Sequence, residues 1–467
     1  MIAKAPAGRI AFWVIGLVAL VARLSWYGDP RLAIGTADTR TYVDSSRAAL
    51  FSRQSWAGRR LITTNLVYKL VSARADCEDI AVSAPAIGQE RPREIRSCYA
   101  DVAVLQALVS IAGWAFLAFA VVRHLRSTPA QVLAGGIILL FGFTPQVAEW
   151  DSVLGSESLS LSLLAFSCGS LVELAFSLGT ETGNRTARRA AVCALWLVSF
   201  VLWVFVRDVH LYAIPVTLLL LAALLLSGPR GGRPLVLGLG AVLAVTFLFG
   251  MASSKGSTRW QPSIQHSLET FVLPYAARVD YMQERFGMPA PGSTSYQAWF
   301  EHSAPAAYSG FLLAHPGFIV TEIVRNWNVF VLSYRQPYFP LASTSPSSPL
   351  SHLGEALHPD SSVFHVLDLL LVAFLVIGWL NNPTRHDLVW ACVTAWLLAV
   401  GYVTLFFSFF GDTDGVVRHV APSLEMLRLL MWLSLIAVLD SHLRARGTVE
   451  GSRPASDDRP MAGSDAA

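Results

Sequence analysis

Ten stretches of mostly apolar residues, each long enough to cross a bilayer as a helix, constrain the fold of this chain more than any other feature. A spanning helix needs about 20 such residues to cross a hydrocarbon core of about 30 Å. The composition agrees, because 54% of the 467 residues are hydrophobic and 14% are charged, which is less charge than soluble domains carry. The sequence therefore predicts an all-α polytopic membrane protein. The predicted spans are 10–27, 102–122, 130–147, 158–177, 190–206, 211–226, 235–251, 363–380, 388–410 and 424–439.

The short loops between these stretches predict the orientation of the chain. Lys and Arg in short loops are retained in the cytoplasm. Lys4 and Arg9 place the N-terminus there, and counting the spans alternately brings the other basic loops and the C-terminal end to the same side. We therefore expect a multi-pass protein of the cell inner (plasma) membrane with both termini in the cytoplasm. The other basic positions are Arg123, Arg126, Arg185, Arg188, Arg189, Arg230, Arg233, Arg385, Arg444, Arg446 and Arg453.

Two long segments, 28–101 and 252–362, fall on the opposite, outer side. Connections of this length in a compact protein are usually functional. The second segment contains an amphipathic stretch, 318–327, which predicts a helix lying in the outer interface. Residues 1–443 are expected to form one membrane domain, and the polar tail 444–467 is expected to be disordered.

The five cysteines divide between the outer side and the spans. Cys77 and Cys98 fall in the first outer segment, whereas Cys168, Cys193 and Cys392 fall in predicted spans. An oxidising exterior favours a disulfide between the first two, and closing a loop of that size contributes about 3 kcal/mol. The alternative is two unrelated free thiols.

The sequence lacks the glycine-rich motifs of nucleotide-binding proteins. It has neither a Walker loop nor a strand followed by Gly-x-Gly-x-x-Gly. ATP and nucleotide sugars are absent outside the cytoplasm, so an enzyme there must take an activated group from a lipid carrier. A phosphate-linked lipid donor requires an acidic base for the incoming hydroxyl, cations for the departing phosphate and an apolar path for the tail.

The candidate base is Asp38, shortly after the first span and close to Tyr42. A carboxylate at the water–lipid boundary is partly desolvated, which predicts a raised pKa. The alternative is that Asp38 caps the following helix through its side chain, and the sequence leaves the two open. Asp44 is the reserve candidate.

The candidate cations lie on two short outer turns. Arg418 and His419 are on the last of them, and Arg207 and His210 follow the fifth span. The guanidinium fork donates two hydrogen bonds to a phosphate that gains charge in the transition state. The alternatives are that Arg207 pairs with a neighbouring carboxylate and that these residues contact lipid headgroups.

No cofactor is required by this chemistry, although a divalent metal is possible. Asp412 and Asp414 present two carboxylates at the spacing that suits a hard cation. Glu149, Asp151 and Glu157 could complete an oxygen shell. A solvated turn is the alternative explanation of the two aspartates.

Other polar and aromatic residues could complete a pocket. Glu425 and Arg428 are one helical turn apart and can pair inside a span, close enough to Arg418 to form a wall of a donor pocket. Asp368 has no local partner, so it faces either a watery cavity or another helix. The outer aromatic candidates for stacking on a sugar are Trp260, Tyr296, Trp299 and Trp327.

Three short motifs occur in a characteristic order on the outer side. They are Asp38-x-x-x-Tyr42, Ser156-Glu157-Ser158-Leu159 before a Leu-rich span, and Arg418-His419-Val420-Ala421-Pro422 at the entrance to the last span. In order and sidedness the chain resembles the GT-C class of integral-membrane glycosyltransferases, which includes protein mannosyltransferases, aminoarabinose transferases and arabinosyltransferases.

The resemblance implies a sugar transferase that uses a polyprenyl-phosphate-linked donor and a glycan, lipid or protein acceptor at the bilayer, with no nucleic acid partner. Asp38 would be the base and Arg418 the phosphate ligand. Many members carry paired acidic residues at the first motif, whereas Thr39 follows Asp38 here. Asp38, Asp44 and Glu157 therefore all remain candidates for the base.

Two other functions compete with this interpretation. A transporter or flippase of lipid-linked glycans would carry polar residues along a path through the midplane and, often, repeated halves, and neither is clear here. A glycan polymerase or ligase with a lipid-diphosphate donor would also place Arg and His outside. An Asp directly after the first span favours the transferase over it.

Overall fold

The computed structural model describes residues 6–36, 38–71, 80–82, 93–95, 97–178, 186–227, 233–338 and 348–451. In that part of the chain, seven helices are long and apolar enough to cross a membrane, and two bent helix pairs raise the number to as many as nine. Every predicted span coincides with a helix, so the prediction of an all-α polytopic membrane protein is confirmed. The bundle helices are α1 (Pro6–Tyr27), α5 (Ala100–His124), α6 (Thr128–Phe143), α8 (Glu157–Ser177), α9 (Thr186–Val204), α10 (Ala213–Ser227), α11 (Arg233–Lys255), α17 (Val363–Asn381), α18 (Arg385–Gly411) and α19 (Val416–Gly451).

Three of the ten predicted spans differ in detail from the structure. The described apolar parts of α1 and α10 are shorter than the seven long spans. Helix α6 ends at Phe143, because Pro145 cannot continue it, and the chain bends by 48° into α7 (Pro145–Ala148) and η2 (Glu149–Ser152).

The remaining elements are short and connect or cover the bundle. Helix α15 contains residues 318–325 of the predicted amphipathic stretch 318–327, with Val320 and Val324 exposed on it. The helices are η1 (Ser97–Tyr99), α2 (Thr39–Ser46), α3 (Arg53–Ala57), α4 (Ile62–Leu70), η4 (Asp208–Tyr212), α12 (Trp260–Phe271), α13 (Ala276–Phe286), α14 (Thr294–Ala314), α15 (Pro316–Arg325), η6 (Trp327–Phe330) and α16 (Pro349–Leu357). Strands β1 (Ile34–Gly35), β2 (Ile80–Val82) and β3 (Arg93–Ile95) form an antiparallel sheet in the order β1-β3-β2.

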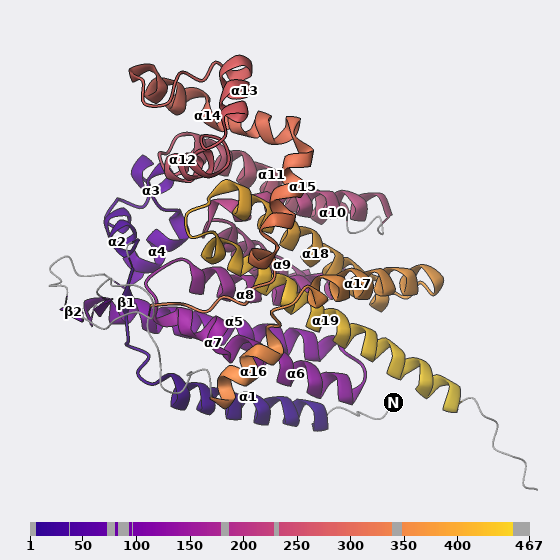
Figure 1. Cartoon of the computed structure of the whole chain (residues 1–467). Helices are drawn as coiled ribbons and strands as arrows, with labels where there is room; N and C mark the ends of the chain where they lie inside the picture. The colour runs from indigo at the N-terminus through magenta and orange to yellow at the C-terminus, as the bar shows by residue number, and fades with distance from the viewer. Residues whose placement is uncertain are drawn as a thin grey trace, which may run out of the picture.

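The predicted basic loops meet at one end of the bundle, which we call the basic end. Asp440 of α19 accepts hydrogen bonds from the backbone N–H groups of Arg126 and Ser127 in the α5–α6 turn. Arg444 pairs with Asp387 of α18 at 2.7 Å. Helix α1 begins and α19 ends at this end (Figure 1). The loops that the sequence places on one side therefore lie together.

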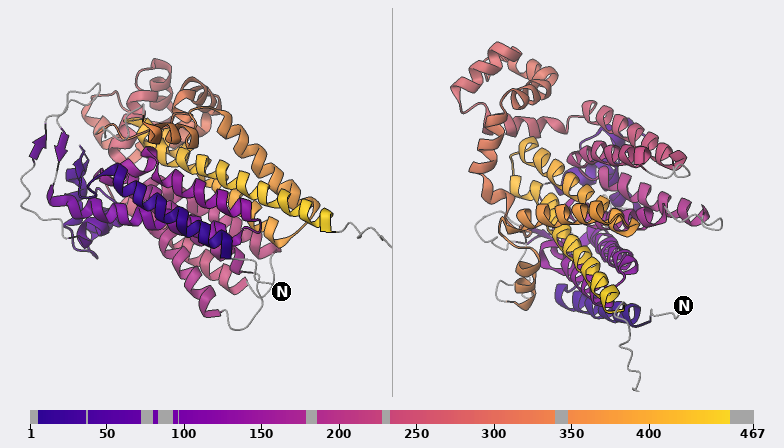
Figure 2. Two further views of the ribbon diagram at one scale, coloured as in Figure 1. Left: turned by 90° about the horizontal axis from the view of Figure 1, so that it is seen from below. Right: turned by 90° about the vertical axis from the view of Figure 1, so that its right-hand side faces the viewer.

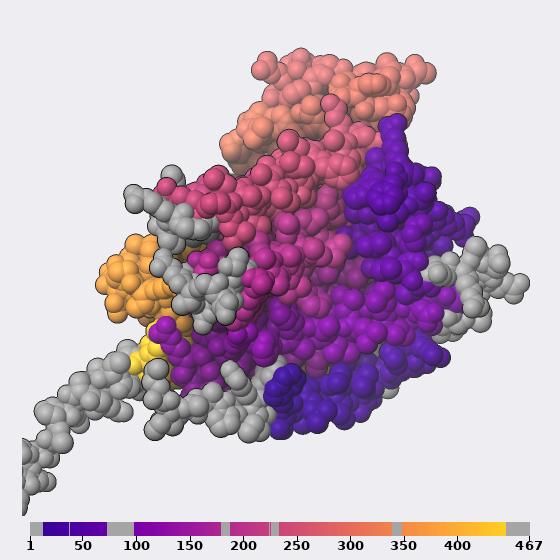
Figure 3. All heavy atoms as spheres, turned by 180° about the vertical axis from the view of Figure 1, so that it is seen from behind, coloured from indigo at the N-terminus to yellow at the C-terminus, as the bar shows by residue number. Residues whose placement is uncertain are grey.

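The opposite end carries α2, α3, α4 and the small sheet, and the segment α12–α15 projects from the bundle at the top of the view (Figures 1 and 3). Helices α14 and α15 meet at an angle of 87°. We call this the site end, because the predicted site residues gather there.

Close packing of α5 against α8 fixes the start of α8. A Cβ on Gly113 would lie 2.6 Å from the Ser162 carbonyl oxygen, and one on Gly169 would lie 3.1 Å from Leu117 Cα. Small residues permit such approaches between membrane helices. As a result, α8 is surrounded by other elements, and 83% of its apolar stretch is buried.

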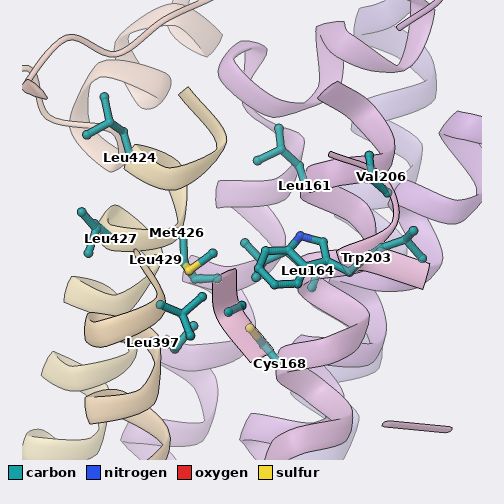
Figure 4. Close-up of a cluster of buried hydrophobic side chains, with 14 of the residues drawn as sticks. Leu161, Leu164, Cys168, Trp203, Val206, Leu397, Leu424, Met426, Leu427 and Leu429 are labelled. Atoms are coloured by element: carbon teal, nitrogen blue, oxygen red, sulfur yellow. The ribbon is translucent and has the colours of Figure 1, made fainter. Parts of the chain in front are cut away.

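The core beneath the site end joins helices that are distant in sequence. Side chains of α8, such as Leu161 and Leu164, face Trp203 of α9 and Leu397 of α18, with Leu427 of α19 alongside (Figure 4). Helix α19 runs the length of the bundle beside α17 and α18 (Figure 2). This packing brings the N-terminal ends of α8 and α19 together at the site end.

Candidate active site

Asp38 lies between two arginines from opposite ends of the chain. Its Oδ1 accepts a hydrogen bond from Arg60 Nη2 and its Oδ2 one from Arg418 Nη2, each at 2.7 Å. It occupies the N-cap position of α2, but its side chain makes no capping hydrogen bond. The side chain of Asp38 therefore does not cap α2.

The two guanidinium groups reverse the expected pKa shift of Asp38. Burial alone would raise the pKa, but the charges and hydrogen bonds of Arg60 and Arg418 outweigh it and hold the pKa at about 2. The sequence predicted a raised pKa for Asp38, and this prediction is wrong. It considered the desolvation of the carboxylate but not the two arginines.

Arg60 is a central residue of the site that sequence reasoning missed. Its Nε donates to Thr41 Oγ1 at 2.6 Å and its Nη1 to the Tyr42 hydroxyl at 3.3 Å. The guanidinium carbon also lies 4.1 Å from the centre of the Tyr42 ring, a cation–π distance. One feature of the sequence could have pointed to Arg60: Arg59-Arg60 is the only adjacent arginine pair in the first outer segment.

Glu157, at the start of α8, holds the other predicted cations together. Its Oε1 lies 3.2 Å from Arg207 Nη2 and 3.5 Å from Arg418 Nε. Arg207 also donates from Nη1 to the His419 carbonyl oxygen at 3.3 Å. The structure thus brings Asp38, Glu157, Arg207, Arg418 and His419 into one cluster.

The three candidate carboxylates differ in their surroundings. Glu157 is enclosed, with 6% of its side chain exposed, whereas the Asp38 side chain is 32% exposed. Asp44 is 57% exposed and lies near Arg40 and Arg47 of its own segment, at 3.9 and 3.6 Å. Of the three, Asp38 is the one that both pairs with Arg418 of the cluster and has about a third of its side chain exposed.

A cavity of about 330 Å³ lies beside this cluster, a size typical of small-molecule sites. Its lining contains both ionisable and apolar residues. The ionisable ones include Arg59, Arg60, Arg207, Asp208, Arg259, Asp412, Arg418 and His419, and the apolar ones include Leu211, Met251, Ile264 and Phe407. Arg259, which sequence reasoning also missed, pairs with Asp208 at 2.8 Å.

Asp412 lines the cavity, whereas Asp414 is exposed. Asp412 Oδ1 lies 3.1 Å from His266 Nδ1, and its Oδ2 accepts from Ser263 Oγ at 2.8 Å and lies 3.7 Å from His419 Nε2. Asp414 contributes its backbone N–H to Asp412. Among the described residues, no group of three or more His, Cys, Asp or Glu side chains could hold a metal ion.

Asp151 and His210 lie in buried networks outside the cavity. Asp151 forms a buried ion pair with Arg23 and accepts from Ser158 Oγ at 2.6 Å. The His210 ring stacks on Trp203 with centroids 4.2 Å apart, and its Nδ1 is 3.0 Å from the Trp203 carbonyl oxygen. Their contacts anchor the segments that carry the cluster.

Arg428 pairs with Glu425, as its spacing predicts, at 2.8 Å. Glu425 also contacts His358, and Arg428 donates to the carbonyl oxygens of Val331 and Pro359 at 2.8 and 3.2 Å. The pair therefore fastens the outer segment to α19. It does not line the cavity.

The four aromatic residues predicted to stack on a sugar lie in different surroundings. Trp260 lines the cavity. Trp299 is buried and donates from its indole to the Phe286 carbonyl oxygen at 3.0 Å, and Tyr296 packs near it. Trp327 is partly exposed beside Phe330. Trp260 is thus the candidate that the structure places at the cavity.

Cys98 is disulfide-bonded, while Cys168, Cys193 and Cys392 are free. Cys77 lies outside the described residues, so its pairing with Cys98 stays a prediction. The tail beyond residue 451 also lies outside them.

The sequence matches no family model and no curated protein. Among solved structures, the chain is similar to the oligosaccharyltransferase of Archaeoglobus fulgidus in its apo form, at 12% identity and a TM-score of 0.44, covering 97% of this chain and 53% of that one. It is also similar to the archaeal oligosaccharyltransferase AglB of Archaeoglobus fulgidus in complex with an inhibitory peptide and a dolichol-phosphate, at 13% identity and a TM-score of 0.40, covering 96% and 52%. The chain spans about half the length of these proteins, and similarity of this size assigns neither family nor activity to it.

Proposed function

We propose that the protein is a glycosyltransferase of the GT-C type, which transfers a sugar from a polyprenyl-phosphate donor to a cell-envelope glycan, lipid or protein acceptor outside the cytoplasm. The observation that carries the proposal is the Asp38 carboxylate held between Arg60 and Arg418 beside the cavity. A base and phosphate-binding forks are thereby within reach of one substrate.

In the proposed reaction the donor phosphate draws Arg418 away from Asp38. Asp38 then takes the proton of the acceptor hydroxyl while that oxygen bonds to the anomeric carbon. The bond between the anomeric carbon and the phosphate oxygen breaks, and its electron pair leaves with the polyprenyl phosphate. Arg418 stabilises the charge that the phosphate gains, with Arg60, Arg207 and His419 beside it. Glu157 keeps Arg207 and Arg418 in place.

The net charge of the residues around the cavity supports a donor with one phosphate over a donor with a diphosphate. Five arginines face four carboxylates among the described residues that line the cavity or pair with its arginines. With neutral histidines this leaves one positive charge, which matches the single negative charge of a sugar phosphodiester. These residues are Arg59, Arg60, Arg207, Arg259 and Arg418, with Asp38, Glu157, Asp208 and Asp412.

An apolar surface that reaches the cavity supports a lipid-linked donor. Met251 of α11 lines the cavity and is 42% exposed. The exposed surface of α11 continues through Leu248, Val245 and Val242, and each three-residue step turns this row by about 60° around the helix. A polyprenyl tail can follow this row into the bilayer.

The proposal is tested by incubating the purified full-length protein with a panel of polyprenyl-phosphate sugars and acceptors and measuring the released lipid. Release of polyprenyl phosphate that depends on acceptor supports the transferase. Release of polyprenyl diphosphate from a diphosphate donor would instead identify a polymerase or ligase. Donor movement between leaflets of proteoliposomes with no released carrier would identify a flippase.

A further inference from the structure

Asp208 is a carboxylate of the cavity wall that the proposed reaction does not use. It is the first residue of η4 and lines the cavity together with Arg207. The Asp208 side chain is 44% exposed, whereas that of its ion-pair partner Arg259 is 5% exposed. A small number of polar groups placed in this way fixes the orientation of a ligand in a pocket.

The partner of Asp208 is itself held in place by its surroundings. Arg259 donates from Nη1 to the Gly58 carbonyl oxygen at 3.4 Å and from Nη2 to Ser253 Oγ at 3.1 Å. Its Nε–H is shared between Oδ1 and Oδ2 of Asp208, at 2.9 and 2.8 Å. One donor of a fixed guanidinium group therefore positions the carboxylate.

This contact leaves most of the acceptor capacity of Asp208 unused. An ionised carboxylate has about four lone-pair sites for hydrogen bonds. Among the described residues, Arg259 is the one that donates to the Asp208 side chain, and it does so with a single N–H group. Both carboxylate oxygens can therefore accept hydrogen bonds from a molecule in the cavity.

Arg207 and Asp208 are consecutive residues with different partners. Arg207 contacts the Glu157 carboxylate and the His419 carbonyl oxygen of the cluster around Asp38. Adjacent Cα atoms are about 3.8 Å apart, and the sugar of a donor is bonded directly to its phosphate. A phosphate bound at Arg207 would therefore bring its sugar within reach of Asp208.

An aromatic pair lines the cavity close to Asp208. Tyr212, the last residue of η4, stacks on Phe407 of α18 with ring centroids 3.6 Å apart and an interplanar angle of 9°. The stacking fixes the orientation of the Tyr212 ring. The negative face of an aromatic ring attracts polarised C–H groups, which sugars carry beside their hydroxyl groups. The pair thus offers a sugar an apolar contact next to a hydrogen-bond acceptor.

We propose that Asp208 is a specificity-determining residue, which accepts hydrogen bonds from hydroxyl groups of the donor sugar. The inference rests on the proposed function, which supplies a lipid-linked sugar. The substrate class is a sugar with free hydroxyl groups on neighbouring ring carbons, because each oxygen of the carboxylate can accept from one of them. Hydrogen bonds to an ionised acceptor are stronger than those between neutral groups.

Two kinds of lipid separate the sugar from the phosphate in a binding experiment. Polyprenyl-phosphate sugars and polyprenyl methyl phosphate carry the same phosphodiester charge, and the methyl ester lacks the sugar. Microscale thermophoresis of the purified full-length protein in detergent measures the affinities. We expect the wild-type protein to bind polyprenyl-phosphate glucose, mannose or arabinose more tightly than polyprenyl methyl phosphate.

Asp208→Asn should lower the affinity for the preferred sugar lipid about tenfold, the usual cost of losing a hydrogen bond to a charged group. The affinity for polyprenyl methyl phosphate should not change. The asparagine keeps an oxygen that can accept from Arg259 Nε, and loss of an ion pair at a partly exposed carboxylate costs little stability.

Two further variants complete the experiment. Asp208→Glu keeps the charge and can keep the ion pair with Arg259, so it replaces Asp208→Asn if that variant does not fold. It moves the carboxylate by one methylene group, and its loss of affinity should again be confined to the sugar lipids. Asp280→Asn, which changes an exposed carboxylate of α13 outside the cavity, is the matched control and should bind both kinds of lipid like the wild-type protein.

Three results would overturn the inference alone, provided that the wild-type protein still releases polyprenyl phosphate from a sugar lipid. An equal loss for both kinds of lipid in Asp208→Asn would assign Asp208 a structural role, and unchanged affinities for both would remove it from the sugar site. Equal wild-type affinities for polyprenyl methyl phosphate and every sugar lipid would show that the sugar makes no favourable contact. If the wild-type protein binds neither kind of lipid, the proposed function fails together with the inference.

Discussion

Asp38 and Arg418 are 380 positions apart in sequence, and their side chains meet at 2.7 Å. The contact joins the first outer segment to the start of the last helix. It places a carboxylate next to a guanidinium group that lines the cavity, which is the relationship on which the proposed reaction depends.

Asp38→Asn should lower the transfer rate by about 10²- to 10⁴-fold, the usual loss when a general base is removed. Binding of the lipid-linked sugar should persist, because Asp38 does not hold the donor in the proposed reaction. Single-turnover rates and donor binding measure the two effects separately. Asp44→Asn, in the same segment but on an exposed carboxylate, is the matched control and should stay active. Full activity of Asp38→Asn would move the base to Asp44 or Glu157.

Arg418→Ala should weaken donor binding and lower turnover together, since its charge meets the phosphate before and during the reaction. Loss of one such donor typically costs about 10²- to 10³-fold in rate. Arg444→Ala, which breaks an ion pair at the basic end, should leave both quantities near wild type. A loss confined to turnover, with unchanged donor affinity, would contradict the phosphate role of Arg418.

The lowered pKa of Asp38 predicts how stability depends on pH. A carboxylate whose pKa falls from 3.8 to about 2 on folding contributes stability above its unfolded pKa and loses it as the pH falls towards 2. The wild-type protein should therefore exceed Asp38→Asn by about 2 kcal/mol at neutral pH, and the gap should close between pH 4 and pH 2. Unfolding in detergent followed by tryptophan fluorescence measures it. A gap that stays constant down to pH 2 would show that Arg60 and Arg418 do not hold Asp38 ionised.

Substitutions of two buried carboxylates should change the stability of the protein in opposite directions. Glu425→Gln should destabilise the protein by about 3 kcal/mol, because it removes the nearer carboxylate partner of the fully buried Arg428 and leaves Asp360, at 3.9 Å. Asp368 is fully buried in α17, and neither of its carboxylate oxygens has a hydrogen-bond partner among the residues that the structure describes, so Asp368→Leu should be stabilising. Thermal unfolding of the two variants tests the contrast. A lower melting temperature for Asp368→Leu would mean that the carboxylate has a role in the folded state.

The orientation of the bundle can be tested with two single cysteines in a background that lacks the native ones. Phe51→Cys lies at the site end, where Phe51 is 89% exposed, and Asn382→Cys lies in the exposed α17–α18 turn at the basic end. A membrane-impermeant reagent should label the first in intact cells and the second only after permeabilisation. The reverse pattern would place the candidate site in the cytoplasm.

The helices and their grouping could be predicted because both depend on local sequence. Apolar length alone located the spans, and the basic loops placed Asp38, Glu157, Arg207 and Arg418 at one end. Arg60 escaped prediction because its role depends on the turn between α3 and α4, which folds it over Tyr42. The pKa of Asp38 was mispredicted for the same reason, since two arginines distant in sequence decide its sign.

Other contacts were not predicted for the same reason, because their partners are far apart in sequence. Asp151 meets Arg23 of α1 and Glu425 meets His358 of the outer segment only after the helices pack. No periodicity within one helix specifies such partners. Arg428 with Glu425 is the exception, because partners one turn apart are set by helical geometry.

The contacts of Asp38 with Arg60 and Arg418 have a consequence for the proposed donor. A carboxylate tethered 2.7 Å from both guanidinium groups is present at a very high effective concentration, against which a freely diffusing anion must compete. A phosphate confined to the bilayer by its tail is itself concentrated near the membrane surface. In the proposed reaction, the ion pairs of Asp38 therefore favour anchored phosphates over soluble ones.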